Sequence, residues 1–318
     1  MTAEQPTEVT AAVTAIKPEA DGIVSLHLAP AAGDKLPAWE AGAHVDLVLG
    51  PGLERQYSLC GDPADLTRWR LGVLREPESR GGSAHVHERL AVGDEVVCRG
   101  PRNNFSLVDA DRYLFVAGGI GITPILPMVR ACEVAGKPWR LFYGGRAEPT
   151  MAFREELAHH GDRVVLWPQE SHGVLDLDTV LGSPTAGTAI YCCGPGALLD
   201  AVEQRCAAWP AGSLHLERFR PRDGALDGGN TAFEVELDAS GITLTVGAGQ
   251  TLAEAIEDAG VDLPTSCREG TCGTCETYVL EGEPDHRDSY LTAEEQASGE
   301  VIMPCCSRSR SARLVLDL

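Results

Sequence analysis

Apolar and polar positions alternate over short stretches between residues 9 and 107, and glycine, proline and aspartate interrupt them. This alternation is typical of strands that bury one face. One helix is expected from Ser83 through Glu88 to Leu90. The expected strands are Val9–Ile16, Ile23–Leu28, Val45–Leu49, Gln56–Leu59, Trp69–Val73 and Glu95–Arg99. Short strands of this kind predict an antiparallel barrel.

The hydrophobic period changes after residue 107, where short apolar runs begin to alternate with helical patterns. Strands are expected at Tyr113–Val116, Arg140–Tyr143, Val164–Leu166 and Ala189–Cys192. Helices are expected at Thr123–Ala135, Phe153–His160, Asp176–Leu181 and Gly196–Ala207. Alternating strands and helices predict an α/β domain whose parallel sheet is covered on both faces.

A stretch rich in glycine, proline and charge follows, and then two alternating strands, Phe233–Leu237 and Ile242–Val246, with a helix at Leu252–Ala259. A hairpin packed on a helix favours a β-grasp (α+β) fold. We therefore expect a barrel domain at 1–107, a nucleotide domain at 108–221, a linker at 222–232 and a third domain at 233–318.

The 318 residues carry a net charge of −21, and the excess is uneven, because residues 233–318 hold seventeen acidic and five basic side chains. Acidity argues against a nucleic-acid partner and suits docking on a basic protein surface. No apolar run is long enough to span a membrane, and residues 1–14 lack the features of a signal peptide. Eleven cysteines fit a reducing compartment, so a cytoplasmic location is expected, and a monomer is compatible with the sequence.

Three cysteines, Cys267, Cys272 and Cys275, stand at C-x₄-C-x₂-C spacing, and Cys305 follows after twenty-nine intervening residues. This is the plant-type pattern for a [2Fe-2S] cluster held by four thiolates. Glycines between the cysteines permit the tight loop that such a cluster needs. Zinc is the alternative, although zinc sites usually pair one C-x₂-C with a second pair of ligands.

Two segments of the expected barrel suggest a phosphate site. On one strand, Arg55 and Tyr57 project to the same face, with Gln56 and Ser58 between and after them. Arginine can bind a phosphate bidentately, and tyrosine can flank an aromatic ring. The second segment is a glycine-rich start of the expected helix, where backbone amides favour an anion. Its residues are Arg80, Gly81, Gly82 and Ser83.

Two glycine-rich loops follow strands of the expected parallel sheet. The first, Gly118–Pro124, is not the usual dinucleotide fingerprint, and no acidic partner is evident about twenty positions later. The second contains Cys193, Gly194 and Pro195. Because ligands bind at the carboxyl ends of such strands, the two loops together predict a nucleotide site.

The order of these motifs resembles the phthalate dioxygenase reductase and vanillate demethylase reductase family, within the ferredoxin–NADP reductase superfamily. The segment Glu281–Asp288 and the ending Leu314–Leu318 are the most specific parts of the resemblance.

The resemblance implies a six-stranded barrel that binds FMN, a middle domain that binds NADH and a C-terminal plant-type ferredoxin. It places Arg55, Gln56, Tyr57, Ser58 and the 80–83 segment at the flavin. Further residues would lie near the nicotinamide, the NADH phosphates or ribose, or the flavin ring. They are Gly119, Thr123, Arg146, Cys193, Gly194, Pro195 and Phe219, of which Thr123, Cys193 and Phe219 would lie at the reacting atoms.

The implied function is an NADH-dependent reductase, in which a flavin converts a two-electron donor into single electrons for the cluster and then for a partner oxygenase. A Rieske-type partner is expected. FMN is expected because no aromatic insert for an adenine follows Ser83, and NADH because Glu148 would oppose a 2′-phosphate. The alternatives are an FAD-containing reductase, a reductase for a cytochrome P450, and a cluster-based redox sensor without hydride chemistry.

Overall fold

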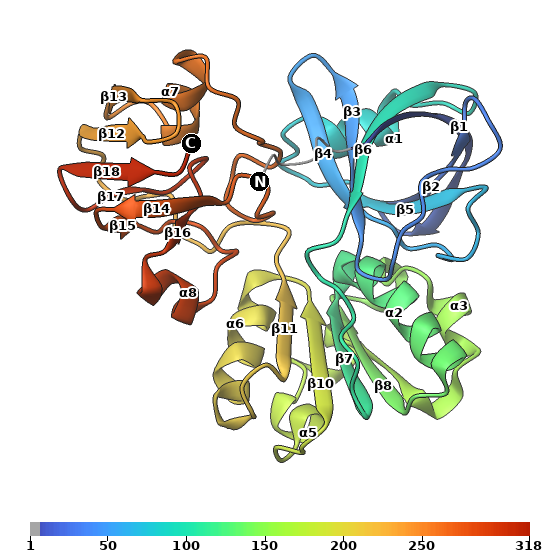
Figure 1. The fold of residues 1–318 in the computed structure, drawn as a ribbon. Helices are drawn as coiled ribbons and strands as arrows, with labels where there is room; N and C mark the ends of the chain where they lie inside the picture. Colours follow the sequence, from blue (N-terminus) through green and yellow to red (C-terminus); the bar gives the residue numbers. More distant parts are fainter. Residues whose placement is uncertain (1–6) are drawn as a thin grey trace. The chain divides into compact units, whose positions relative to one another are not determined.

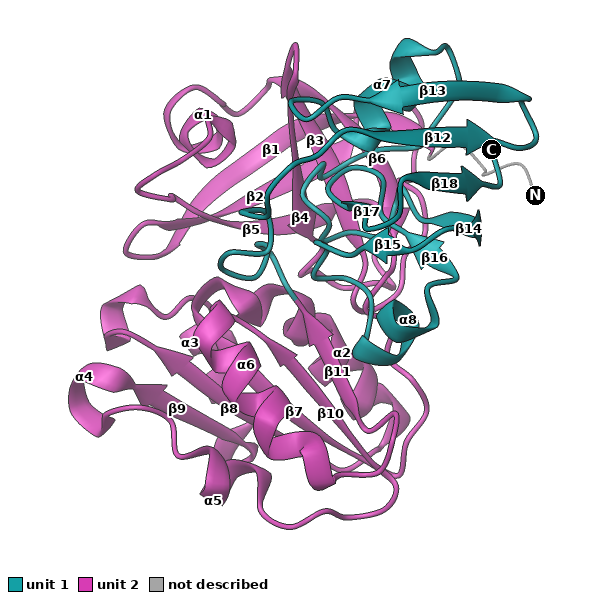
Figure 2. Cartoon of the chain, turned by 90° about the vertical axis from the view of Figure 1, so that its left-hand side faces the viewer, with its two compact units in different colours: residues 1–5, 218–318 teal, residues 6–217 magenta. Residues whose placement is uncertain are grey.

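The structure is a computed structural model that describes residues 7–318 (Figure 1). The chain forms two compact units. The first in chain order ends at Glu217 and is the magenta unit of Figure 2, and the second begins at Arg218 and is the teal unit.

The first unit begins with a six-stranded sheet in the order β4-β3-β6-β1-β2-β5, and every neighbouring pair is antiparallel. The sheet curls until a bridge between Leu59 and Leu71 joins its two ends. Fully buried side chains such as Leu26, Leu47 and Trp69 fill its interior. The strands are β1 (Glu8–Ala20), β2 (Ile23–Pro30), β3 (His44–Gly50), β4 (Leu53–Ser58), β5 (Trp69–Leu74) and β6 (Glu95–Arg102), with helix α1 (Gly82–Glu88) after β5. The predicted antiparallel barrel is confirmed.

The same unit continues into a five-stranded parallel sheet in the order β11-β10-β7-β8-β9. Its strands are β7 (Arg112–Gly118), β8 (Trp139–Gly145), β9 (Val164–Pro168), β10 (Thr188–Cys193) and β11 (Leu214–Glu217). Its α-helices are α2 (Ile122–Ala135), α3 (Arg154–Ala158), α4 (Gln169–His172), α5 (Leu177–Leu181) and α6 (Gly196–Arg205). Short 3₁₀ turns lie at Gly119–Gly121 (η1), Glu148–Thr150, Gly161–Arg163 and Cys206–Ala208.

Helices cover both faces of this sheet, as the alternation of elements predicts. Helices α2 and α3 lie on one face, and α5 and α6 on the other (Figure 1). The neighbours Phe115 and Val116 on β7 are both fully buried, and they belong to the two different cores. A strand buried on both faces is the reason for the continuous apolar run at this position.

Among the elements that differ from the sequence-based expectation are one strand and one helix of this sheet. Strand β11 was not expected, because its two leucines alternate with a histidine and a glutamate and form no apolar run. All four of its residues are half-buried. The helix expected at Phe153–His160 is shorter, since it begins at Arg154 after a left-handed Phe153 with φ of 61°. Phe153 is buried, so packing fixes this backbone conformation.

The second unit contains a mixed sheet in the order β13-β12-β18-β14-β16, in which β12 and β18 are parallel. Helix α7 packs its apolar face on this sheet, and Thr251 and Glu254 form its capping box. The elements are β12 (Phe233–Leu237), β13 (Ile242–Val246), α7 (Leu252–Asp258), β14 (Thr277–Glu281), β15 (Pro284–Asp285), α8 (Ala293–Ser298), β16 (Val301–Ile302), β17 (Arg308–Ser309) and β18 (Arg313–Leu316). The arrangement confirms the expected α+β ferredoxin domain.

The division into domains at 107 and 221 stays a prediction.

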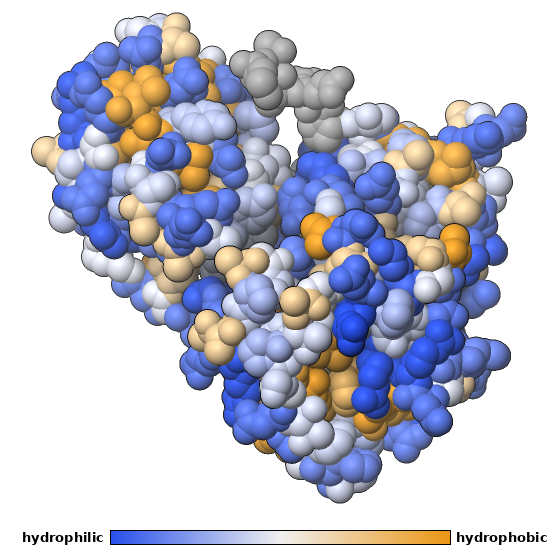
Figure 3. Space-filling model, turned by 60° about the horizontal axis from the view of Figure 1, so that its bottom comes forward, coloured by the Kyte–Doolittle hydropathy of each residue, from blue (hydrophilic) through white to orange (hydrophobic). Residues whose placement is uncertain are grey.

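On the face in Figure 3, apolar and polar surfaces are interspersed. No helix in the described part of the chain combines the length and apolarity that crossing a bilayer requires.

Candidate functional site

Strand β4 and the start of α1 meet through the side chain of Arg55. Its guanidinium donates to the carbonyl oxygens of Glu54 and Arg80, each at 2.7 Å. A Cβ atom on Gly82 would lie 2.3 Å from Cγ of Arg55, so only glycine lets the arginine stem cross the helix start. The structure therefore brings together the two segments of the predicted phosphate site.

Ser83, also predicted for this site, is buried and organises the loop before the helix. Its hydroxyl accepts from the amide of Glu76 at 3.1 Å and donates to Oγ of Ser79 at 3.0 Å. Oγ of Ser79 also accepts from the amides of Gly81 and Ala84. Sequence reasoning missed Ser79, although a serine two residues before a Gly-Gly pair is a turn signal.

Tyr57 lies two residues after Arg55 on β4 and is partly buried against the barrel core. Burial raises the pKa of its phenol to about 12, so the ring stays neutral. Ser58 is buried, whereas Gln56, between Arg55 and Tyr57, is half-buried. A neutral, partly buried ring beside an arginine is suited to cover one face of a flat aromatic ligand.

The two glycine-rich loops of the parallel sheet are in contact. A Cβ atom on Gly121 would lie 2.3 Å from the carbonyl oxygen of Cys193 and 2.7 Å from the amide nitrogen of Gly194. A Cβ atom on Gly118 would lie 2.7 Å from Cδ of Pro195. The contact places both loops at the carboxyl ends of β7 and β10, where parallel sheets bind nucleotides.

Thr123 stands where the nucleotide sheet meets the barrel. Its hydroxyl donates to the carbonyl of Ile120 at 2.9 Å, and its methyl group lies 2.6 Å from the position of a Cβ atom on Gly72 of β5. Gly119, at the start of the loop, has φ of 54°, a conformation that glycine tolerates best. Sequence reasoning missed Gly72, because no local pattern reports a contact fifty residues away.

Cys193 and Glu217 are register partners at the ends of β10 and β11. The Cys193 thiol donates to Oε2 of Glu217 at 3.8 Å. Burial raises the pKa of Glu217 to about 8 and raises the pKa of Cys193 well above its usual value. Both groups are therefore held protonated near neutral pH, and the carboxyl can donate a hydrogen bond to a ligand at this edge.

Two predicted residues lie apart from these contacts. Arg146 follows β8, so it stands at the same edge of the sheet as Cys193, and its side chain is exposed. Phe219 belongs to the second unit, and 41% of its surface is exposed. Its role over the flavin stays a prediction.

The four predicted cluster ligands gather in the second unit. Hydrogen bonds from the thiols of Cys272 and Cys305 lower the pKa of Cys267, and the same contact with Cys305 lowers the pKa of Cys275. Cys272, Cys275 and Cys305 are buried, and Cys267 is partly exposed. Among residues 7–318 no three His, Cys, Asp or Glu side chains are arranged around a single metal ion. The four sulfurs instead form a chain of contacts from Cys272 through Cys267 and Cys305 to Cys275. In a binuclear cluster each iron takes only two of the four thiolates.

The loop around these cysteines has the backbone that a cluster requires. Amides of Glu269 and Thr271 both donate to Sγ of Cys267 at 3.4 Å, which stabilises a thiolate. Gly270 and Gly273 have φ of 71°, and a Cβ atom on Gly273 would lie 2.4 Å from the Tyr290 ring. The donor set and the loop therefore fit a [2Fe-2S] cluster.

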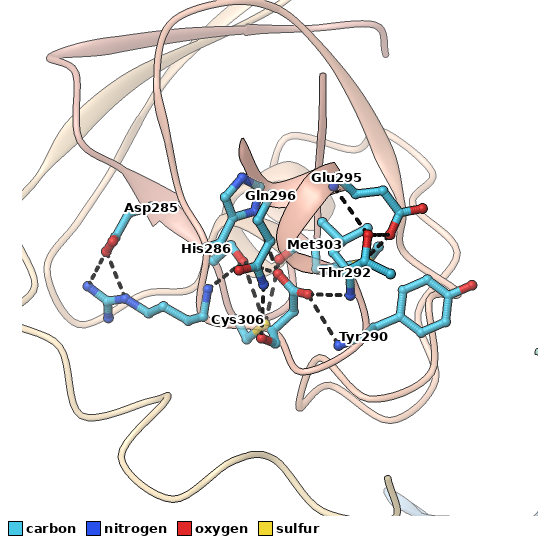
Figure 4. Close-up of polar contacts among 12 residues, drawn as sticks. Asp285, His286, Tyr290, Thr292, Glu295, Gln296, Met303 and Cys306 are labelled. Atoms are coloured by element: carbon cyan, nitrogen blue, oxygen red, sulfur yellow. Dashed lines mark hydrogen bonds and ion pairs between the residues drawn. The ribbon is translucent and has the colours of Figure 1, made fainter. Parts of the chain in front are cut away.

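Cys306, next to the last predicted ligand, contacts it, because a hydrogen bond with Cys306 helps to raise the pKa of Cys305. The Cys306 thiol lies 3.8 Å from the carbonyl oxygen of Met303 and contacts Gly270 (Figure 4). The contacts with Met303 and Gly270 are those of a packing residue.

Comparisons with known proteins agree with this arrangement. Residues 115–204 match the family model of the oxidoreductase NAD-binding domain, and residues 235–310 match that of the 2Fe-2S iron-sulfur cluster binding domain. The chain is 44% identical to the phenoxybenzoate dioxygenase subunit beta of Ectopseudomonas oleovorans, over 96% of both chains. It is 41% identical to the vanillate O-demethylase oxidoreductase of a Pseudomonas strain, over 96% of this chain and 98% of the relative.

Solved structures give the same picture. Phthalate dioxygenase reductase is 36% identical, with a TM-score of 0.73 over 98% of both chains. An intact type IV self-sufficient cytochrome P450 monooxygenase is 43% identical, with a TM-score of 0.88. This chain is covered completely by that match but spans only 43% of the P450 chain.

Proposed function

The chain belongs to the phthalate dioxygenase reductase and vanillate O-demethylase reductase family, and from this premise we propose that it is the NADH-dependent reductase component of an oxygenase system. Electrons would pass from NADH through a flavin and a [2Fe-2S] cluster to the oxygenase. The observation that carries the proposal is the four-thiol loop in the same chain as the paired glycine loops of a nucleotide-binding sheet.

The protein's own residues act by binding and orientation. Arg55 and the Gly82–Ser83 helix start would hold the flavin phosphate, and Tyr57 would cover one face of the ring. Thr123 would fix the position of the nicotinamide at the barrel. The flavin, when bound, supplies the exchange between two-electron and one-electron chemistry.

Cys193 and Glu217 would keep a protonated, hydrogen-bonding pair beside the nicotinamide. Because both groups are neutral, they polarise the carboxamide without repelling the reduced, electron-rich ring. The cysteines at 267, 272, 275 and 305 would hold the cluster.

We propose FMN as the flavin and NADH as the donor. The α1 segment from Gly82 to Glu88 is short and carries no Phe, Tyr or Trp side chain that could stack on an adenine. Beside Arg146, Glu148 forms an ion pair with Arg154, so the second nearby cation is already neutralised. A 2′-phosphate beside Arg146 would therefore gain little from Arg154, whose charge Glu148 already balances.

We propose a Rieske-type oxygenase as the acceptor. Support comes from curated relatives that match over almost their whole length and are named as parts of dioxygenase and demethylase systems. A P450 is the second candidate, because the P450 structure contains a region 43% identical to the complete chain.

Anaerobic titration followed by visible absorption tests the proposal. NADH should bleach the flavin and cluster bands together, and NADPH should do so at least tenfold more slowly. A preparation with cluster bands and no flavin bands, even after incubation with FMN and FAD, would refute the reductase function. Chromatography of the extracted flavin distinguishes FMN from FAD, and reconstitution with a Rieske oxygenase or a P450 distinguishes the two acceptors.

A further inference from the structure

The segment Asp285–Ser289 overlaps the family-specific stretch Glu281–Asp288, yet none of the sites above uses it. It begins on β15, which pairs with β17 through Pro284–Ser309 and Asp285–Arg308. Arg287, in its centre, is buried, although arginine is seldom buried without partners. Its partners therefore indicate what the segment does.

The guanidinium of Arg287 binds the predicted linker. It donates to the carbonyl oxygens of Gly228 at 3.3 Å and Gly229 at 3.1 Å, and to Oδ1 of Asn230 at 2.7 Å. Asp285 balances its charge through a hydrogen bond of 2.9 Å from Nε of Arg287. A planar guanidinium can address several acceptors at once, which a lysine cannot do.

A second contact holds the linker at its beginning. The amide of Arg222 donates to Oγ of Ser289 at 2.8 Å. Between the two contacts the chain folds into turns, in which the amides of Ala225 and Asp227 donate to the carbonyls of Arg222 and Gly224. Residues 222–230, which belong to the linker expected at 222–232 and are called the tether below, are thus folded onto the segment 285–289.

The same segment contacts the cluster loop on its other side. The amide of Ser289 donates to the carbonyl of Gly270 at 2.9 Å, and a Cβ atom on Gly270 would lie 2.8 Å from Cα of Asp288. Asp288 in turn accepts a hydrogen bond from the amide of Tyr290, whose ring lies against Gly273. The segment is therefore the physical connection between the tether and the loop of the cluster.

We propose that Arg287 is a positioning residue for electron transfer. It fixes the tether to the cluster domain, and this limits how far the cluster can move from its electron donor. Nine freely extended residues would span roughly 30 Å. Folding them removes this slack and raises the effective concentration of the cluster at its electron donor. The inference rests on the proposed function, because it concerns the step that delivers electrons to the cluster.

Two adjacent glycines offer a matched test. A Cβ atom on Gly228 would lie 2.7 Å from Cζ of Arg287, whereas a Cβ atom on Gly229 would meet nothing within 4 Å. Gly228→Ala should therefore displace the guanidinium, and Gly229→Ala is the control with the same change of backbone entropy. Arg287→Lys changes the other side of the same contact. It keeps the positive charge and loses the planar guanidinium that reaches several acceptors.

In anaerobic stopped-flow mixing with NADH, flavin bleaching should be unchanged in all three variants. Cluster reduction should be at least fivefold slower in Gly228→Ala and Arg287→Lys, and unchanged in Gly229→Ala. Hydrogen exchange of residues 222–230 should be faster in the two slow variants, while their iron content and cluster spectrum stay as in the wild type.

Cluster reduction at the wild-type rate in both Gly228→Ala and Arg287→Lys would overturn the proposal. If Arg287→Lys loses iron, Gly228→Ala decides, since it leaves the segment 285–289 intact. A wild-type cluster that NADH does not reduce would refute the proposed function instead, and the exchange comparison would still test the tether contact: unchanged exchange in Gly228→Ala would overturn it.

Discussion

The sheet places the carboxyl group of Glu217 where water solvates its charged form poorly. Its position at the end of β11, opposite Cys193, follows from strand register, and burial then raises its pKa to about 8. The shift in its pKa depends on the atoms that surround it in the fold, which no sequence pattern reports. Ser79 and Gly72 were missed for the same reason, because their importance comes from the atoms they contact.

The raised pKa of Glu217 predicts a pH-dependent stability. Between its unfolded pKa near 4.5 and its folded pKa near 8, the folded state binds the extra proton, so stability should fall as pH rises through this range. Glu217→Gln removes the titrating carboxyl group and with it this dependence of stability on pH. We expect its melting temperature to exceed that of the wild type by a few degrees at pH 9, with a smaller difference at pH 6.

Thermal unfolding across this pH range measures the effect. Glu155→Gln, an exposed change on α3, is the control and should follow the wild type. Parallel curves for Glu217→Gln and the wild type would contradict the assignment. The rate of reduction by NADH should also lose its inflection near pH 8 in Glu217→Gln.

At the scale of elements, strand β4 and helix α1 show how a binding site forms from segments that are separate in sequence. Each segment has a local pattern of its own, and those patterns predicted a phosphate site at Arg55 and at Gly82–Ser83. The contact between them is tertiary, because the arginine stem crosses the helix start where Gly82 has no side chain. The site residues stay predictions, and their proximity makes them testable as a pair.

Gly82→Ala should weaken flavin binding about tenfold, because the new methyl group displaces Arg55 from the helix start. Arg55→Ala should have a similar effect. Flavin retained after purification and the dissociation constant of added FMN measure it. Gly61→Ala, whose Cβ atom meets nothing closer than 3.4 Å, should bind flavin like the wild type. Equal affinity in Gly61→Ala and Gly82→Ala would contradict the site.

At the scale of the whole molecule, acidic and basic side chains are distributed unevenly between the parts of the chain. Residues 233–318 hold seventeen acidic and five basic side chains, whereas residues 1–107 hold fifteen and ten. The cluster domain is thus the part that a basic protein surface would attract. This distribution supports docking of the oxygenase on the cluster domain.

Transfer to the oxygenase should therefore depend on salt. Between 50 and 300 mM NaCl, the apparent KM for the oxygenase should rise severalfold, because screening lengths fall below roughly 10 Å. Reduction of ferricyanide by NADH is the control and should change little, since no protein docking is needed. An equal response of both reactions to salt would contradict docking through charge.

The sequence by itself determined the features that depend on residue spacing along the chain. The four cysteines, the change from period two to helical period, and the two glycine loops are local patterns. They predicted the cluster ligands, and they identified the barrel and the parallel sheet. Only the tertiary structure decided which distant residues meet. It joined Arg55 to Gly82, Gly121 to Cys193, and Arg287 to the tether, and it showed a linker that is folded where composition indicates flexibility. The physical reason is that such contacts depend on shape and close approach between elements, which no local pattern encodes.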